Sequence, residues 1–493
     1  MRRRSLWVTP ALIAAFALPC QAANAQAPSV PPTISTQPEL VPRFSPSVYD
    51  YVTRCGPDGS VSVSVDAPPH AWVFVGRRLP RTGVFSTTVS LAEGQRFAIT
   101  VFGPGWRVST YHVRCLPPDF PSFTSQRTGA TQAQWYVVAP FSVSPPNASP
   151  PNVSPNYVAI FDANGVPVWW YRSTTQALDA KLLANGHIGW LQYNQFEMLQ
   201  AGADEHRLDG SLVRHADTVD GGADHHELLL LRNGNYLLAR YPVLRGVDLR
   251  PCGGPADAAI YDNELQEVTP NGSLVWSWRA SDHLTAADVA PRWTSVCTET
   301  SPADIFHFNS AEPDRSGYVL SLRHLDAVLR IDRVTGAVEW KLGGTPSTTS
   351  LSPVGDPAMA GGGFAGQHDA RILRDGTLTV HDNGTRAARP PRAVRYRLDL
   401  RARTATLIED IRDSAAPESF CCGSARRLAG GNWVTSWGGQ PFITELTPAG
   451  VPVFRLTFTQ GMFSYRADPV PFGRLRADAL RRAMDQMQRR TGP

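Results

Sequence analysis

The chain has 493 residues, a charged content of 18% and a formal net charge of +4 at pH 7. Three of the positive charges lie at residues 2–4, in a leader segment, so the remainder is close to neutral. A near-neutral chain lacks the basic surface that nucleic acid or an anionic membrane attracts, so neither is expected as a partner. The length exceeds one ordinary hydrophobic core and predicts two domains or a repeat architecture.

The first residues predict export. The arginines at residues 2–4 precede an apolar run at residues 6–18 and a small-residue site at residues 23–25, the pattern of a secretory signal peptide. We expect residues 1–25 to direct the chain through the Sec route and to be removed, leaving a periplasmic or secreted protein. The apolar run is too short to cross a bilayer, so no membrane span is expected. A lipoprotein route through Cys20 and a twin-arginine route are weaker alternatives, because each motif is incomplete.

Six cysteines remain once the leader is removed: Cys55, Cys115, Cys252, Cys297, Cys421 and Cys422. An even number in an oxidising compartment predicts disulfides. Proximity along the chain favours pairing the first with the second and the third with the fourth. The last two would then form a vicinal disulfide or remain as two thiols.

A hairpin pattern recurs along the chain, with Asn-Gly, Asp-Gly and Thr-Gly turns between alternating apolar residues. Its six copies lie at residues 157–172, 197–215, 263–279, 327–343, 393–411 and 442–458. Between them lie more apolar hairpins whose turns contain Gly186, Gly234, Gly317, Gly376 and Gly431. Two hairpins make a four-stranded blade, and a closed ring of blades leaves no free sheet edge. The predicted fold class is all-β, with a six-bladed β-propeller over residues 122–468.

Three further segments complete the predicted organisation. Residues 43–118 alternate apolar and polar side chains at period two, which predicts a small N-terminal β-sandwich stapled by one disulfide. Residues 141–156 are rich in Pro, Ser and Asn and predict a loop inside the first blade. Residues 472–493 predict a C-terminal helical tail, with an arginine-rich helix on the surface.

Three histidines occupy one position in successive inner hairpins. His226 and His368 lie eight residues before the turn glycine of their hairpins, and His307 lies ten residues before its own. The same position falls near Leu178 and Cys422 in two other units. Because inner strands line the central channel of a propeller, we expect these side chains to meet at one mouth of it. A single histidine would more often be structural, but three at one repeat position favour a functional site.

The returning strands add arginines on the same side. Arg240 and Arg323 each lie six residues beyond a turn glycine. Arginine offers bidentate donors to sulfate or phosphate, and histidine acts as nucleophile, acid or base near neutral pH. Three imidazoles could also bind zinc, but neighbouring guanidinium groups oppose a cation, so we predict an anionic substrate, no metal and no cofactor. His225, His324 and His381 neighbour the repeat position and should point to the opposite side of their strands.

At these residues the sequence resembles the bacterial arylsulfotransferase family, in a divergent branch. The resemblance spans most of residues 220–447 and is carried by DHHEL at 224–228, LQEVTPNGSLVWSWRASDH at 265–283, DIFHFNS at 304–310, LRH at 322–324, FAGQHDARILRDGTLTVHDNG at 364–384 and GGNWVTSWGGQPFITEL at 430–446. It implies a six-bladed propeller that transfers a sulfuryl group from an aryl sulfate to a phenol without a nucleotide.

The resemblance also implies roles for individual residues. His368 would be the nucleophile and carry the sulfuryl group as a sulfohistidine, in a ping-pong mechanism. The sulfuryl and phenolic oxygens would be held by His226, His307, Asn309 and Arg323, and either His226 or His307 would be the acid and base. Arg240 and His225 are further substrate-binding candidates. The hydroxyl that the family carries late in the chain has no clear counterpart here; Thr435 and Ser436 are the candidates.

Three functions compete on this evidence. The leading hypothesis is a sulfuryl transferase whose partners are small phenols and aryl sulfates. The second is a non-catalytic propeller that binds a sulfated or other anionic ligand, or a partner protein. A quinone-dependent dehydrogenase is disfavoured, because those propellers differ in blade number and carry a tryptophan-docking repeat that is not found here.

Overall fold

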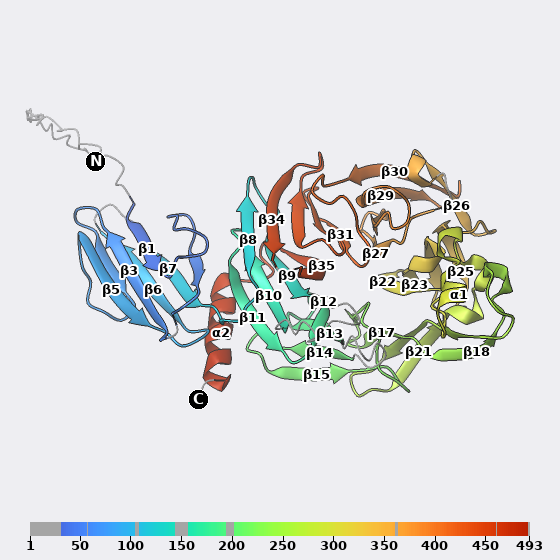
Figure 1. The fold of residues 1–493 in the computed structure, drawn as a ribbon, viewed down its shortest axis with the longest axis horizontal. Coiled ribbons are helices and arrows are strands. Elements are labelled where there is room, and N and C mark those ends of the chain that lie inside the picture. The colour runs from blue at the N-terminus through green and yellow to red at the C-terminus, as the bar shows by residue number, and fades with distance from the viewer. Residues whose placement is uncertain are drawn as a thin grey trace, which may run out of the picture.

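The computed structural model describes residues 31–56, 58–103, 108–142, 156–193, 202–359, 363–459 and 461–491. Within these ranges the protein is built almost entirely of β-strands, in a small N-terminal body beside a larger one (Figure 1). The predicted signal peptide and most of the predicted loop at residues 141–156 lie outside the described residues. No helix in the described ranges is both long enough and apolar enough to cross a membrane.

The N-terminal body consists of two sheets that share one hydrophobic cluster. The first sheet has the order β1-β3-β5 and the second β2-β7-β6-β4; the strands are β1 (Thr33–Gln37), β2 (Asp50–Thr53), β3 (Ser60–Asp66), β4 (Trp72–Val75), β5 (Val84–Ser90), β6 (Arg96–Phe102) and β7 (Ser109–Cys115). Strand β3 illustrates the period-two pattern, because its three valines are buried and its serines face outward. The body begins ten residues before the predicted boundary at residue 43.

The larger body contains four-stranded units in chain order. Counted over the described residues there are six: β9 (Ala133–Phe141), β10 (Asn156–Asp162) and β11 (Pro167–Ser173) with β35 (Phe463–Pro471); β12 (Gln176–Leu182), β13 (Ile188–Tyr193), β14 (Ala203–His206) and β15 (Leu212–Ala216); β16 (Leu229–Leu230), β17 (Tyr236–Arg240), β20 (Glu264–Val268) and β21 (Leu274–Arg279); β22 (Phe308–Asp314), β23 (Gly317–Leu322), β24 (Ala327–Asp332) and β25 (Val338–Gly343); β27 (His368–Ile372), β28 (Leu378–Asp382), β29 (Arg392–Asp399) and β30 (Thr404–Ile411); β31 (Ser424–Arg427), β32 (Trp433–Ser436), β33 (Phe442–Leu446) and β34 (Pro452–Phe458). Strands β12, β22, β27, β31 and β35 face the middle of this body in Figure 1.

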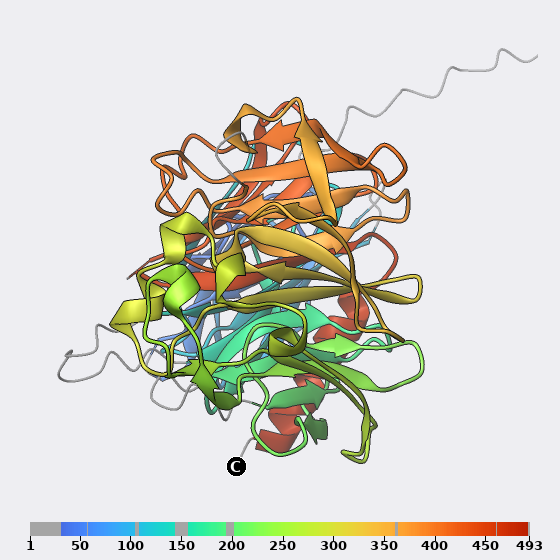
Figure 2. The same cartoon turned by 90° about the vertical axis from the view of Figure 1, so that its right-hand side faces the viewer.

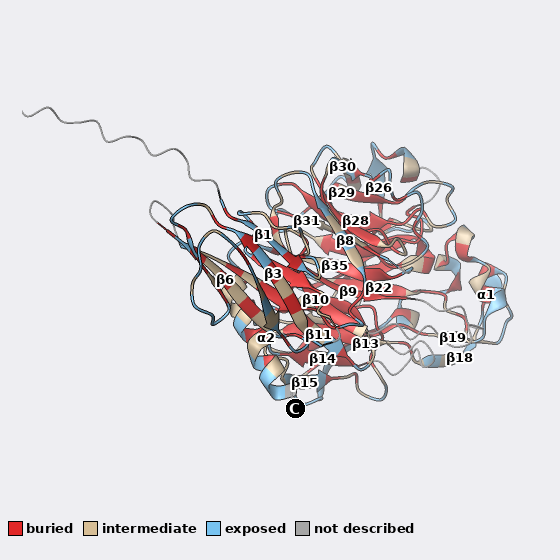
Figure 3. Cartoon of the chain, turned by 60° about the vertical axis from the view of Figure 1, so that its left-hand side comes forward, coloured by how far each residue is buried: buried red, intermediate tan, exposed pale blue. Residues whose placement is uncertain are grey.

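The two ends of the chain complete the first and last of these units. The late strand β35 pairs with β9, and β8 (Phe123–Arg127) adds a fifth strand to the last unit by pairing with β34. The short β26 (Ser350–Val354) joins the fourth and fifth units into one nine-stranded sheet. These pairings attach the last strand of the chain to the first unit, an early strand to the last unit, and the fourth unit to the fifth. Figure 3 shows the buried residues concentrated in these strands.

The inner hairpins depend on glycine in two different ways. Gly234 and Gly376 have φ values of 85° and 78°, the left-handed conformation that a tight turn requires and that other residues rarely adopt. Gly317 is different, since it starts β23 and a Cβ there would lie 1.9 Å from the carbonyl oxygen of Ile331. The left-handed turn residue of that hairpin is Arg315, which accounts for the longer spacing between His307 and its glycine.

An excursion between β17 and β22 carries the second disulfide. It contains β18 (Val243–Val247), β19 (Ala258–Tyr261), α1 (Val296–Glu299) and the 3-10 helices η1 (Arg250–Cys252), η2 (Ala280–Asp282), η3 (Ala286–Asp288) and η4 (Pro291–Trp293); two more 3-10 helices, η5 (Arg323–Leu325) and η6 (Pro357–Met359), follow later. In Figure 2 the short yellow-green helices gather on one side of the larger body. Both predicted disulfides are confirmed, with S–S distances of 2.15 Å for Cys55–Cys115 and 2.11 Å for Cys252–Cys297. Cys421 and Cys422 are free thiols, so the vicinal disulfide is absent.

The C-terminal helix α2 (Ala477–Thr491) is more than a surface tail. Its apolar face, including Leu480 and Met484, belongs to the same hydrophobic cluster as the first unit of the larger body. Its polar face reaches the N-terminal body, where Asp485 pairs with Arg96 at 2.7 Å and with Arg114 at 2.9 Å. The helix therefore joins the two bodies, as its position between them in Figure 1 shows.

Candidate active site

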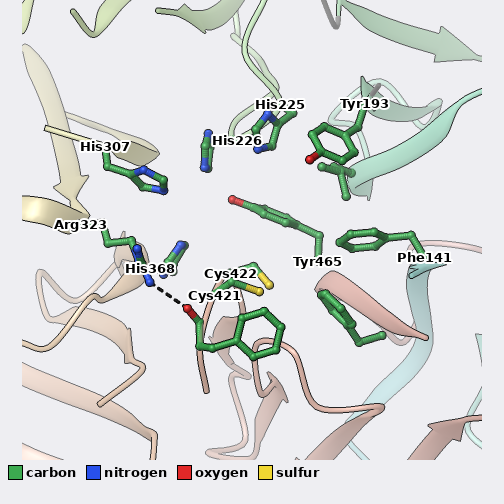
Figure 4. A pocket seen from close by; sticks show the side chains of 13 residues that line it. Phe141, Tyr193, His225, His226, His307, Arg323, His368, Cys421, Cys422 and Tyr465 are labelled. Atoms are coloured by element: carbon green, nitrogen blue, oxygen red, sulfur yellow. Dashed lines mark hydrogen bonds between the residues drawn. The ribbon is translucent and has the colours of Figure 1, made fainter. Parts of the chain in front are cut away.

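A pocket of about 230 Å³ opens where the innermost strands of the larger body begin. Each of the six four-stranded units contributes to its wall, either from a strand or from the segment just before or after one. The lining residues are Phe141, Leu178, Tyr193, His225, His226, His307, Arg323, His368, Phe420, Cys421, Cys422, Phe463 and Tyr465 (Figure 4). The pocket is polar on the side of the histidines and Arg323, and aromatic on the side of β35 and β9.

The structure brings together the residues at the repeat position. The ring centroids of His226 and His307 lie 5.1 Å apart, and those of His307 and His368 lie 6.5 Å apart. Arg323 lines the same side, where its guanidinium packs 4.4 Å from the ring of Trp293. Leu178 and Cys422, which lie at or next to the repeat position in other units, also line the pocket.

The hydrogen bonds of His368 define its tautomer. Its Nδ1 lies 3.0 Å from the carbonyl oxygen of Gly366 and 3.0 Å from the side-chain oxygen of Asn383. The amide nitrogen of Asn383 donates to the carbonyl oxygens of Cys421 and Cys422, which fixes the orientation of the amide. Since both neighbours of Nδ1 are acceptors, Nδ1 carries the proton and Nε2 keeps a lone pair.

The environment of His368 also keeps the ring neutral. Burial lowers its pKa well below the ordinary 6.5, and the nearby charge of Arg323 lowers it further. A neutral imidazole with a free Nε2 lone pair is the form in which histidine acts as a nucleophile.

His226 and His307 are each bound to a carboxylate. The Nδ1 of His226 lies 2.6 Å from Asp224, and the Nδ1 of His307 hydrogen-bonds Asp304. Burial alone would raise the pKa of Asp224, but the neighbouring histidines hold it at about 2, so this carboxylate is ionised at neutral pH. Burial raises the pKa of Asp304 and lowers that of His307 well below 6.5. The pKa values of the two carboxylates are therefore shifted in opposite directions.

The neighbouring histidines divide differently from the prediction. His225 was expected to point away, but it lines the pocket and stacks on His226 with a centroid distance of 4.2 Å. The prediction was wrong because residues 225–226 form a bend before β16, where the alternation of a strand does not apply. His324 lies behind His307 at 4.6 Å, and His381 is fully buried opposite His368, so both lie outside the lining.

Two other predicted contacts are not formed. Arg240 was expected in the site, but it lies directly across from Glu264 in the sheet and its Nε donates to that carboxylate at 2.8 Å. Asn309 is fully buried outside the lining, and its side-chain nitrogen donates to the carbonyl oxygen of Gln367 at 2.8 Å. Asn309 therefore supports the backbone next to the nucleophile candidate. Thr435 and Ser436 are buried in β32 and do not line the pocket.

The backbone at the pocket rim adopts an uncommon conformation. His307, Asp369 and Cys422 have φ values of 53°, 55° and 41°, although none is glycine. Such residues cost on the order of 1–3 kcal/mol each and cluster at functional sites. The left-handed conformation of Asp369 separates the directions of two neighbouring side chains. His368 faces the pocket, whereas Asp369 faces the buried arginines below it.

Those charges form the floor of the site. Arg371 pairs with Glu227 at 2.6 Å and with Asp369 at 2.8 Å, and Arg466 pairs with Asp179 at 2.5 Å. All five side chains are at most 5% exposed. Arg371 and Arg466 are therefore neutralised by carboxylates, and among the described lining residues Arg323 is the arginine that faces the pocket.

Several members of the site were not predicted from the sequence. Asp224, Asp304 and Asn383 lie inside the motifs that carry the family resemblance, so a search for carboxylate or amide partners of each histidine could have found them. The aromatic residues Tyr193, Phe420 and Tyr465 had no comparable signal. They come from strand ends and loops whose position in the ring depends on tertiary structure.

Two clusters offer the residue types that bind a metal. In the first cluster, Asp224, His225 and His226 place ligand atoms within 4.8 Å of one another. In the second, Asp304, His307 and His324 do the same. In both clusters the carboxylate already hydrogen-bonds an imidazole Nδ1. The arrangement suits paired carboxylates and imidazoles that hold and move protons, beside the neutral ring of His368 and the guanidinium of Arg323.

Residues 186–459 match the family model described as arylsulfotransferase (ASST). The chain belongs to this family. No curated protein matches it. In this arylsulfotransferase-family chain, the matched segment includes the three histidines of the repeat position and Arg323, whereas Tyr465 lies beyond it.

Solved structures that resemble this family member include three of low identity. A Bacteroides caccae protein of unknown function is 14% identical, with a TM-score of 0.43, over 69% of this chain and 99% of that one. Virginiamycin B lyase from Staphylococcus aureus is 10% identical, with a TM-score of 0.34, over 86% and 99%. The β-propeller domain of Myceliophteria thermophila Cps50 (Swd1) is 10% identical, with a TM-score of 0.32, over 70% and 89%.

Proposed function

We propose that this pocket transfers a sulfuryl group from an aryl sulfate to a phenol through a sulfohistidine on His368. The observation that carries the proposal is the state of His368, whose Nδ1 is bound by two oxygen acceptors while its Nε2 lone pair is free and its ring neutral. An imidazole in this form can attack sulfur without first losing a proton. Family membership supports sulfuryl transfer as the reaction class.

The first half-reaction uses the two sides of the pocket. The Nε2 of His368 attacks the sulfur, and the bond between sulfur and the aryl oxygen breaks. Arg323 faces the sulfuryl oxygens, whose negative charge it offsets. The aromatic side chains opposite provide a surface on which the phenyl ring of the donor packs.

The departing phenoxide requires a proton, and His226 is the better donor. An ionised carboxylate stabilises a protonated imidazole; the pKa of Asp224 is lowered to about 2, whereas burial raises that of Asp304. In the second half-reaction His226 takes the proton of the acceptor phenol, whose oxygen attacks sulfur as the nitrogen–sulfur bond breaks. The proton and the sulfuryl group are both conserved over the cycle, and no nucleotide is needed.

We further propose that the six four-stranded units are the blades of a six-bladed propeller over residues 122–468, behind a sandwich domain at residues 43–118. The inner strands of all six units then surround one axis, which explains why each unit contributes to the pocket. Export to the periplasm or medium through the signal peptide at residues 1–25 agrees with the two disulfides.

The experiment uses mature protein, 4-nitrophenyl sulfate as donor and phenol as acceptor, without nucleotide. With donor alone, release of 4-nitrophenol should stop at one equivalent per enzyme; continued release is expected only when phenol is present, and His368→Asn should abolish both. Intact mass of protein incubated with donor alone should show one added sulfuryl group on the wild type and none on the variant. A panel of aryl sulfates and phenols without turnover would favour the non-catalytic propeller, and full activity of His368→Asn would remove the nucleophile assignment.

A further inference from the structure

Tyr465 places a hydroxyl group inside the pocket without a partner. The residue lies in β35, is 5% exposed, and its Oη is buried and accepts or donates no hydrogen bond among the described residues. Leaving a buried hydroxyl unpaired is unfavourable, and such groups in a binding site are commonly satisfied by the ligand.

The position of the ring aims that hydroxyl at the polar side of the pocket. The ring centroid of Tyr465 lies 6.0 Å from that of His226, with the two rings nearly perpendicular. The guanidinium of Arg466 lies 5.4 Å from the ring centroid of Tyr465. Figure 4 shows the hydroxyl pointing into the space bounded by His226, His307 and His368, while the ring extends back toward Phe141. The hydroxyl therefore reaches the region where the proposed reaction places the sulfuryl group.

The hydroxyl acts there as a donor. Burial raises the pKa of Tyr465 well above 10, although the charge of Arg466 acts in the opposite direction. The phenol consequently keeps its proton throughout the neutral range. A neutral phenol donates a hydrogen bond to an anionic oxygen but does not serve as a base.

We propose that the Tyr465 hydroxyl donates a hydrogen bond to an oxygen of the sulfuryl group during its transfer to and from His368. This inference rests on the proposed function and adds a catalytic residue to it. Together with Arg323 it gives the sulfuryl oxygens donors from two sides of the pocket, one cationic and one neutral. Stabilisation of developing charge by a fixed donor is among the larger contributions to catalysis.

The test is Tyr465→Phe, which keeps the ring and the aromatic wall and removes only the hydroxyl. We expect kcat/KM to fall about 100-fold. The loss should be equal for aryl sulfates whose phenols differ in pKa, because the sulfuryl oxygens are common to all donors. Tyr157→Phe is the matched control: Tyr157 is also buried, but its hydroxyl donates to Asp119, outside the pocket, and turnover should be unchanged. Thermal unfolding of both variants checks that they fold.

A second readout does not depend on turnover. Inorganic sulfate, titrated by calorimetry, should bind the wild type and Tyr157→Phe equally and Tyr465→Phe about tenfold more weakly. Unchanged kcat/KM and unchanged sulfate affinity would overturn the proposal. So would a loss that grows with the pKa of the leaving phenol, since the hydroxyl would then act on the aryl oxygen.

The two proposals fail in different ways. If the wild type turns over no aryl sulfate, the proposed function fails, and the sulfate titration alone decides the role of Tyr465. Weaker binding by Tyr465→Phe then supports an oxyanion contact, and equal binding excludes it. A wild type that neither turns over donors nor binds sulfate overturns both.

Discussion

The Nδ1 of His368 lies 3.0 Å from the side-chain oxygen of Asn383, whose amide nitrogen donates at 2.9 Å to each carbonyl oxygen of Cys421 and Cys422. A single amide thus connects the proposed nucleophile to the segment that contains Cys421 and Cys422. It leaves Nε2 unprotonated and fixes the plane of the ring. Such outer contacts commonly change activity by about 10- to 100-fold when removed from metal-ligating histidines, and we expect a similar effect here.

Asn383→Asp should shift the pH dependence of the enzyme. An ionised carboxylate beside Nδ1 stabilises protonated His368 and raises its pKa, so a smaller fraction of the ring is neutral at low pH. The acidic limb of kcat/KM should therefore move to higher pH, with the greatest loss near pH 6 and partial recovery near pH 8. Asn383→Ala, which removes the anchor without adding charge, should reduce kcat/KM by about 10- to 100-fold at every pH. Equal pH profiles for the Asp variant and the wild type would contradict the tautomer assignment.

Asp224→Asn should expose the role of His226 in proton transfer. Without the carboxylate at 2.6 Å, the protonated imidazole is less stable and protonates the leaving phenoxide less well. We expect kcat/KM to fall about 100-fold for phenyl sulfate, a poor leaving group, and much less for 4-nitrophenyl sulfate. Asp304→Asn provides the comparison, because it alters the pair around His307 in the same way. If the comparison variant shows the leaving-group dependence and Asp224→Asn does not, His307 is the acid.

The repeat explains which parts of the site were predictable. His226, His307 and His368 could be placed together because each lies at a similar distance along the chain from the turn of its hairpin. Leu178 lies at the same distance from Gly186, and Cys422 lies one residue further from Gly431. Counting residues from a turn does not predict where the backbone bends. The bend before β16 places His225 in the pocket, which the alternation of a strand would not. The count also does not predict pairing across a sheet. Arg240 hydrogen-bonds Glu264 on the neighbouring strand and therefore does not reach the pocket.

The aromatic side of the pocket could not be predicted in the same way. Tyr465 belongs to β35, which comes from the end of the chain and pairs with β9, more than three hundred residues earlier. No hairpin turn fixes its height relative to the histidines. Tyr465 could be assigned to the site only once the pairing of β35 with β9 was known. The contact of α2 with the N-terminal body likewise depends on tertiary structure that the sequence pattern does not show.

His381 should make the folded state sensitive to mild acid. Burial lowers its pKa to about 4, and neither ring nitrogen has a partner among the described residues. The unfolded chain takes up a proton near 6.5 and the folded chain only near 4, so stability falls as pH decreases through this window, by up to about 3 kcal/mol. His381→Leu removes this contribution. Urea unfolding should show the variant gaining stability relative to wild type as pH falls from 7 to 5; a difference that is constant with pH would contradict the argument.

Cys421 and Cys422 should react with alkylating reagents at different rates. Both are free, but Cys421 is partly exposed at the pocket whereas Cys422 is buried, and burial raises the pKa of the Cys422 thiol well above 9. Iodoacetamide should therefore modify Cys421 first, and peptide mass mapping should place the label there. Because Cys421 lines the pocket, saturating phenol should slow its modification. If phenol protects neither cysteine, or if Cys422 is labelled faster, the placement of Cys421 in the pocket wall is wrong.

Asp485 on α2 should matter for stability more than other acidic residues of the same helix. It pairs with Arg96 and with Arg114, whose side chain is only 6% exposed, so its removal leaves a buried guanidinium without its partner. Asp485→Ala should reduce the free energy of unfolding by about 2–4 kcal/mol. Asp478 is the matched control, since its partners Arg476 and Arg482 are exposed, and Asp478→Ala should change stability by less than about 0.5 kcal/mol. Equal effects of the two substitutions in urea unfolding would mean that the helix is held by its apolar face alone, and that the charged contacts between the two bodies contribute nothing measurable.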